Sequence, residues 1–75
     1  MRISQLDGRR VALWGWGREG RAAWRAVRAA LPALPLTLFC NPAEAAEAAA
    51  LGDALLDTRA VADAEALSAF DVVIK

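Results

Sequence analysis

Three glycines with the spacing G-x-G-x-x-G are the residues of this sequence that best suit a chemical task. They are Gly15, Gly17 and Gly20, and they follow the apolar run 11–14 directly. In such a motif the first glycine allows a sharp turn out of a strand, the second lets a phosphate approach the main chain, and the third lets the following helix pack closely on the sheet. Free N–H groups and the positive dipole end at the start of that helix bind anions. The motif predicts a phosphate-binding turn, with a tight turn that binds nothing as the alternative.

Charged side chains stand next to this turn. Arg18 is a candidate diphosphate ligand, because a planar guanidinium suits phosphate oxygens. The carboxylate of Glu19 favours the helix dipole but repels phosphate, so Glu19 either faces solvent or hydrogen-bonds a sugar hydroxyl. At about 100° per residue, Arg21, Arg25 and Arg28 continue a stripe with Arg18, which we interpret as a solvated helix face.

The end of the expected second strand bears on the choice of ligand. An NAD-binding domain carries an acidic residue about 20 positions beyond the motif, and NADP binders often place an arginine nearby. Here the count reaches Cys40 and Asn41, and no arginine occurs between Arg28 and Arg59. A nucleotide diphosphate with a different sugar or base contact therefore fits better than a dinucleotide. We expect Cys40 to be a buried cysteine rather than a reactive thiol, and Asn41 to cap a helix or to offer its amide to a ligand.

The sequence contains few residues or motifs that are typical of catalytic sites. The chain has no histidine, no G-x-x-x-x-G-K-[ST] loop and no Gly-x-Ser-x-Gly elbow. A metal site would need carboxylates at no recognisable spacing, so we predict no metal. We expect this chain alone not to be catalytic.

Composition narrows the class of protein further. Nine basic and nine acidic residues give a net charge of zero, which does not indicate a nucleic-acid partner. No apolar stretch reaches the roughly 18 residues of a membrane span, and the N-terminus lacks the pattern of a signal peptide. We therefore expect a cytoplasmic protein that binds neither nucleic acid nor membranes.

Short apolar strands and helical segments alternate along the chain. We expect strands at 10–14, 36–40, 54–57 and 70–75, and helices at 18–31, 42–51 and 60–69, the last with Asp63 as an alternative cap. This order predicts one α/β domain, a Rossmann-like three-layer fold with a parallel sheet of about four strands and three helices. Alanine makes up much of the apolar fraction, so we expect the large aromatic side chains to supply much of the core: Trp14, Trp16, Trp24, Phe39 and Phe70.

Three segments resemble the N-terminal domain of Mur ligases of the MurD type. They are Val11-Ala12-Leu13-Trp14-Gly15-Trp16-Gly17-Arg18-Glu19-Gly20-Arg21, Phe39-Cys40-Asn41-Pro42 and Asp71-Val72-Val73-Ile74-Lys75. MurD-type ligases add glutamate to UDP-N-acetylmuramoyl-L-alanine in peptidoglycan biosynthesis, and so serve cell wall biogenesis, cell shape and cell division. The glycine turn is similar to that of the variant subfamily that adds L-glutamate, although the family selects the enantiomer in its third domain.

The resemblance implies that residues 1–75 are the UDP-substrate-binding domain, a truncated fragment of a multidomain ligase. It implies UDP-N-acetylmuramoyl-L-alanine and the central and C-terminal domains of the same chain as partners. This fragment would hold no cofactor, whereas the parent ligase would use ATP and Mg²⁺. The residues expected to bind UDP are Gly15, Trp16, Gly17, Arg18, Glu19, Gly20, Cys40 and Asn41.

At two places the sequence departs from the pattern of the family. The diphosphate contacts would come from Arg18 and Glu19, where Glu19 replaces the usual hydroxyl-bearing residue. The uridine contacts would come from Cys40, Asn41 and Pro42, which retain none of the usual acid, hydroxyl and base. The alternatives are an NAD(P)-binding or other nucleotide-binding regulatory module of the potassium-channel type, a dehydrogenase fragment, and a ligand-free interaction domain, which an exposed tryptophan surface would favour.

Overall fold

The computed structural model describes residues 3–60 and 63–74 of the chain. Within these ranges strands and helices alternate as the sequence predicts, after a short N-terminal 3-10 helix that was not predicted. The elements are η1 (Ile3–Leu6), β1 (Val11–Trp14), α1 (Arg18–Ala30), β2 (Leu36–Phe39), α2 (Pro42–Ala49), β3 (Leu56–Arg59), α3 (Ala64–Ser68) and β4 (Val72–Ile74).

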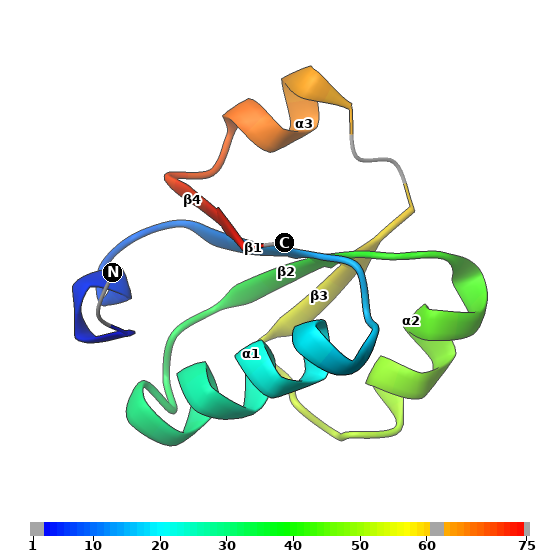
Figure 1. Cartoon of the computed structure of the whole chain (residues 1–75), viewed down its shortest axis with the longest axis horizontal. Helices are drawn as coiled ribbons and strands as arrows, with labels where there is room; N and C mark the ends of the chain where they lie inside the picture. The colour runs from blue at the N-terminus through cyan, green and yellow to red at the C-terminus, as the bar shows by residue number, and fades with distance from the viewer. Residues whose placement is uncertain (1–2, 61–62, 75) are drawn as a thin grey trace.

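The four strands form a parallel sheet in the order β3-β2-β1-β4. Helices α1 and α2 lie on one face of the sheet and α3 on the other (Figure 1). This arrangement confirms the predicted Rossmann-like three-layer class. The chain winds in one direction from β1 to β3 and then returns to the other side of β1, so the winding direction changes beside β1. Ligands of open α/β sheets bind outside the carboxyl ends of the strands at such a point.

The main core lies between the sheet and α1. Val11 and Leu13 of β1 and Leu38 of β2 are fully buried there, and Val27 of α1 packs against them. Trp16 also joins this core, with an exposed fraction of 3%. Continuous apolar strands are expected in a sheet with helices on both faces.

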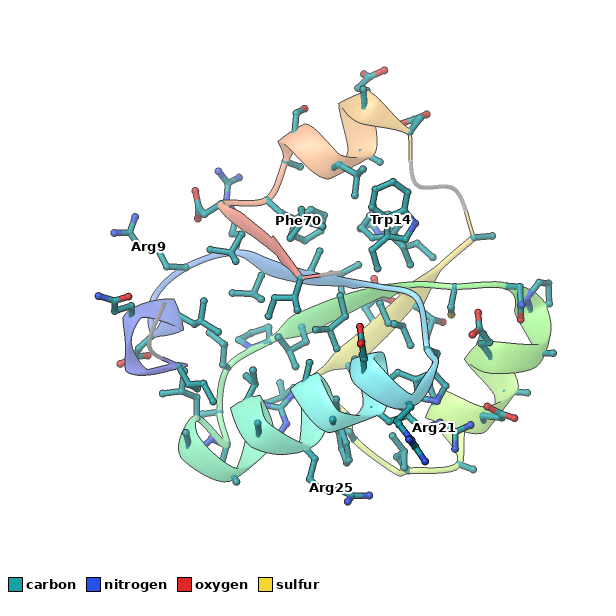
Figure 2. All side chains as sticks on the ribbon, in the orientation of Figure 1. Arg9, Trp14, Arg21, Arg25 and Phe70 are labelled. Atoms are coloured by element: carbon teal, nitrogen blue, oxygen red, sulfur yellow. The ribbon has the colours of Figure 1, made fainter. Side chains whose placement is uncertain are left out.

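The face under α3 is covered less completely. Phe39 and Phe70 pack edge to face there, with ring centroids 5.7 Å apart, but Trp14 is 40% exposed. Figure 2 shows Trp14 and Phe70 on the side of the sheet that α3 occupies. The expectation that Trp14 fills the core is therefore wrong, because it stands at the end of β1 under a helix of only five residues.

Two predicted boundaries shift in the second half of the chain. The third strand, predicted at 54–57, begins at Leu56, because Leu56 pairs with the first residue of β2, Leu36. The preceding residues form a turn, in which the N–H of Leu55 donates to the Asp53 carboxylate. The last helix begins after its cap Asp63, whose side chain accepts from the N–H of Ala66.

The other ends lie close to their predicted positions. The last strand, predicted from residue 70, begins at Val72 and is described as far as Ile74. The predicted helix and strand also include residues 61, 62 and 75, which lie outside the described residues. Every helix in the described part of the chain is too short or too polar to span a membrane.

One member of the arginine stripe is not solvated. Arg28 is half-buried, and its Nε donates to the carboxylate of Asp53 at 2.9 Å. Its Nη1 donates to the carbonyls of Leu31 and Leu34, just beyond the end of α1. The indole N–H of Trp24 donates to the same Asp53 oxygen at 2.8 Å. The interpretation of Arg28 as a solvent-facing residue is wrong, because its guanidinium holds together the segments that follow α1 and α2.

Candidate functional site

A glycine turn joins β1 to α1 at the carboxyl edge of the sheet. Gly15 has φ +97°, a left-handed conformation that side chains disfavour. Its N–H donates to the carbonyl of Phe39 at 2.8 Å, which continues the pairing of β1 with β2 by one residue. The turn is therefore anchored to the sheet at its first residue.

Gly20 keeps the first turn of α1 close to this strand end. A Cβ at Gly20 would overlap the carbonyl oxygen of Gly15 and would lie 3.1 Å from its carbonyl carbon. The close approach that the third glycine allows is thus between α1 and the glycine turn itself. Because the Cα of Gly20 faces this carbonyl group, Gly20 holds the geometry of the turn.

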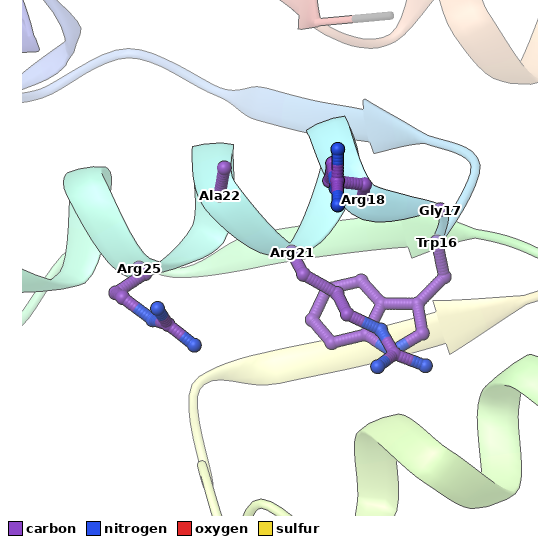
Figure 3. A pocket seen from close by; sticks show the side chains of 6 residues that line it. All are labelled: Trp16, Gly17, Arg18, Arg21, Ala22 and Arg25. Carbon is purple, nitrogen blue, oxygen red and sulfur yellow. The ribbon is translucent and has the colours of Figure 1, made fainter.

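The N-terminus of α1 is open. Gly17 is its N-cap, with no side-chain hydrogen bond to the helix amides, and a Cβ at Gly17 would meet no heavy atom within 4 Å. A hollow of about 420 Å³ beside it is lined by residues of the turn and by the exposed arginines of α1, as Figure 3 shows. Its lining residues are Trp16, Gly17, Arg18, Arg21, Ala22 and Arg25. Helix N–H groups and guanidinium groups together suit an anion such as phosphate.

A second hollow of about 250 Å³ lies at the carboxyl ends of β1, β2 and β3. Its lining residues are Trp14, Gly15, Phe39, Cys40, Asn41, Glu44 and Ala60. Here the N-terminus of α2 is fully capped, because Asn41 accepts from the N–H of Glu44 at 2.8 Å and Glu44 accepts from that of Asn41 at 3.2 Å. This confirms the prediction that Asn41 caps the helix. The two helix N-termini therefore differ, since only that of α1 lacks a side-chain cap.

Glu44 also contacts the glycine turn. Its Oε2 accepts from the backbone N–H of Trp16 at 3.3 Å, across 28 positions of sequence. Sequence reasoning predicted Glu44 only as part of the helix start and missed it as a site residue. The capping pattern of Asn41 and Glu44 is the sequence signal that places Glu44 at the carboxyl edge of the sheet. The contact between Glu44 and Trp16 depends instead on how α2 packs beside the glycine turn.

Cys40 lies in the second hollow as a neutral thiol. Burial raises its pKa, and the negative charge of Glu44 raises it further. A thiol held in this state is a poor nucleophile, because the thiolate is the reactive form. Cys40 is half-buried rather than fully buried, and its environment agrees with the expectation of an unreactive cysteine.

Six of the eight predicted site residues line one of the two hollows, and Glu19 and Gly20 line neither. Trp16, Gly17 and Arg18 line the hollow beside α1, and Gly15, Cys40 and Asn41 line the hollow at the strand ends. Glu19 is exposed and lines neither hollow. The indole of Trp16 is buried in the core, so this residue faces the site mainly through its backbone.

Among the described residues, no three histidine, cysteine or carboxylate side chains form a cluster that could hold a metal ion.

Comparison with known proteins gives close sequence matches along the entire chain. It is 64% identical over 75 residues to the UDP-N-acetylmuramoyl-L-alanine–L-glutamate ligase of Xanthomonas campestris pv. campestris strain 8004. It is 63% identical over 75 residues to the ligase of the same name from Xylella fastidiosa strain Temecula1. In each case the match covers 100% of this chain but only 16% of the relative, in its N-terminal part.

A more distant relative shares a shorter segment. The ligase of the same name from Salinispora tropica is 64% identical over 33 residues, which are 44% of this chain and 7% of the relative. No protein-family model matches the chain. No solved structure gives a significant match.

Proposed function

We propose that this chain is the domain of a UDP-N-acetylmuramoyl-L-alanine–L-glutamate ligase that binds the UDP group of the substrate. The chain is homologous along its whole length to the N-terminal part of such ligases. The chain spans 16% of the length of these relatives. The complete activity therefore requires parts of the ligase that are not among these residues. In this proposal the ligase is cytoplasmic and serves peptidoglycan synthesis.

The open N-terminus of α1 carries the proposal. It stands beside the point where the winding direction of the sheet changes, and no side chain caps its amides. A phosphate can approach the main chain at Gly17, where a Cβ would meet nothing within 4 Å. The N–H groups of the first turn of α1 then donate to the diphosphate, and the helix dipole favours its negative charge.

Arg18 adds a cation to this site. It is exposed, lies in the first turn of α1, and lines the same hollow as Gly17. A guanidinium there offers two parallel donors to phosphate oxygens. Glu19 is also in the first turn, but it lines neither hollow and faces solvent. Arg18 is thus the better placed of the two charged candidates.

The chemical contribution of this domain is binding and orientation. When a protein binds a substrate at a part remote from the reacting group, the binding energy can be used to position that group. In the proposed ligase, the reacting carboxylate is that of the alanine, which forms an amide with the amine of L-glutamate. In this proposal the activation of this carboxylate by ATP and Mg²⁺ takes place in other domains of the ligase, of whose length this chain spans 16%.

An NMR titration of the 75-residue chain with UDP tests the proposal. We expect UDP, and more weakly pyrophosphate, to shift the backbone amide signals of residues 17–20. Gly17→Ala should reduce the affinity for both about tenfold, because its methyl group occupies the space that the phosphate enters. Ala29→Ser is the matched control, since Ala29 is exposed at the other end of α1, and it should leave both affinities unchanged.

NAD serves as the competing ligand in the same titration. If NAD shifted these signals at lower concentrations than UDP, the chain would be a dinucleotide-binding module and the proposal would be wrong. The absence of any shift with UDP and pyrophosphate would also contradict it.

A further inference from the structure

The sequence lacks the acidic residue that dinucleotide-binding folds place at the end of the second strand for the ribose hydroxyls. Cys40 stands there instead, and its neutral thiol is a weak hydrogen-bonding group. The structure brings another carboxylate to the same edge of the sheet. Glu44, four positions later, lines the hollow that Cys40 lines, next to the glycine turn.

The carboxylate of Glu44 is held at both oxygens. Oε1 accepts from the N–H of Asn41 at 3.2 Å and Oε2 accepts from the N–H of Trp16 at 3.3 Å. These two donors come from different segments, so the carboxylate is fixed between the glycine turn and the start of α2. A carboxylate offers about four lone-pair sites. One site on each oxygen therefore remains for a hydroxyl group in the hollow.

The position of the hollow suits the sugar of a nucleotide. Gly15 contributes to its wall from the turn that leads to the open N-terminus of α1, and Asn41 and Glu44 contribute from the start of α2. A nucleotide whose diphosphate lies at the N-terminus of α1 extends its ribose from there toward the end of the second strand. In this chain, that region contains Glu44.

We propose that the carboxylate of Glu44 accepts hydrogen bonds from the ribose hydroxyls of the bound nucleoside diphosphate, in place of an acid at the end of β2. This inference rests on the proposed function, because it requires the diphosphate to bind at the glycine turn. It assigns to Glu44 a binding role beyond its roles in the cap of α2 and in the contact with Trp16.

Ribose analogues separate this role from a purely structural one. The experiment measures the dissociation constants of UDP, 2′-deoxy-UDP, 3′-deoxy-UDP and pyrophosphate for the 75-residue chain and for Glu44→Gln. Glutamine keeps the size of the side chain and is compatible with a capping box. Glu65→Gln is the matched control, because Glu65 is exposed on α3 and lines neither hollow.

We expect the unmodified chain to bind UDP about tenfold more tightly than at least one deoxy analogue, as a charge-assisted hydrogen bond predicts. In Glu44→Gln the affinity for UDP should fall about tenfold and this preference should shrink below about twofold. The affinity for pyrophosphate should stay unchanged, and Glu65→Gln should behave like the unmodified chain.

Three results would overturn the inference. Glu44→Gln could keep the full preference for UDP over both analogues, or it could lose pyrophosphate binding as strongly as UDP binding, which would mean that Glu44 only positions the turn. The unmodified chain could also bind UDP without any preference for the ribose hydroxyls. Failure of the chain to bind UDP and pyrophosphate at all would instead contradict the proposed function, and this inference with it.

Discussion

The Nε atom of Arg28 lies 2.9 Å from the Oδ2 atom of Asp53, and this ion pair joins the last turn of α1 to the segment before β3. Both side chains are largely removed from solvent, with exposed fractions of 17% and 11%. The pair is surrounded by further donors and acceptors, because Asp53 also accepts from the Trp24 indole and Arg28 donates to the Leu34 carbonyl. It therefore fixes two connecting segments at the amino edge of the sheet, opposite the glycine turn.

Removal of Arg28 should destabilise the fold strongly. Arg28→Ala leaves the Asp53 carboxylate without its cation and frees the segment after α1, so the free energy of unfolding should fall by about 2 to 3 kcal/mol. Urea denaturation followed by circular dichroism measures this loss.

Arg21→Ala is the control for this substitution. Arg21 pairs with Glu47 at 2.6 Å, but both side chains are more than half exposed. Its loss should cost less than about 1 kcal/mol. If the two substitutions cost the same, the Arg28–Asp53 pair would not be an anchor of the fold.

The stability of the domain should depend on pH through Asp53. Burial raises the pKa of Asp53, but the hydrogen bonds from Trp24, the N–H of Leu55 and Arg28, together with the charge of Arg28, outweigh it, so the net pKa is lowered. A carboxyl group whose pKa is lower in the folded state stabilises the fold above its unfolded pKa of about 3.9 and loses this contribution as the pH falls through its folded pKa.

Two measurements follow from this lowered pKa. The urea midpoint should be unaffected by Asp53 between pH 5 and 8 and should fall below about pH 4. Asp53→Asn should flatten this decline. In NMR spectra, the indole N–H signal of Trp24 should titrate with a midpoint below the ordinary pKa of aspartate, and a midpoint above it would contradict the lowered pKa.

Gly20→Ala should destabilise the domain, although alanine is normally the better helix former. Its Cβ would overlap the carbonyl oxygen of Gly15, and displacing α1 from the glycine turn should cost about 2 kcal/mol. At Gly17 the space is open, so Gly17→Ala should change the free energy of unfolding by less than about 1 kcal/mol. Thermal unfolding of both variants makes the comparison. A stabilised Gly20→Ala chain would show that the close approach does not constrain this turn.

The features that sequence could predict are those with a local cause. The left-handed turn at Gly15 and the cap formed by Asn41 and Glu44 each depend on residue types within a few positions. The alternation of strands and helices and the parallel sheet follow from apolar runs and breakers in the same way. These elements place the candidate site at the end of β1.

The features that sequence missed depend on contacts between distant segments. Trp14 is exposed because α3 is short, and β3 begins at Leu56 because of its register with β2. The helical pattern alone predicts Arg28 to be a surface residue, because its contact with Asp53 depends on a segment 25 positions away. In the same way, the role of Glu44 beside Trp16 requires α2 to be packed next to the glycine turn.

Cys40 should react slowly with alkylating reagents. Because burial and the Glu44 charge raise its pKa, it carries less thiolate at pH 8 in the folded chain than in the unfolded chain. The rate of reaction with iodoacetamide, measured from pH 7 to 10, should give a higher apparent pKa for the folded chain than for the chain in urea. Glu44→Gln should lower the folded value, whereas Glu47→Gln should not, because only Glu44 lines the hollow with Cys40. A folded chain that reacts faster than the unfolded one would instead mark Cys40 as an activated thiol and would reopen a chemical role for the end of β2.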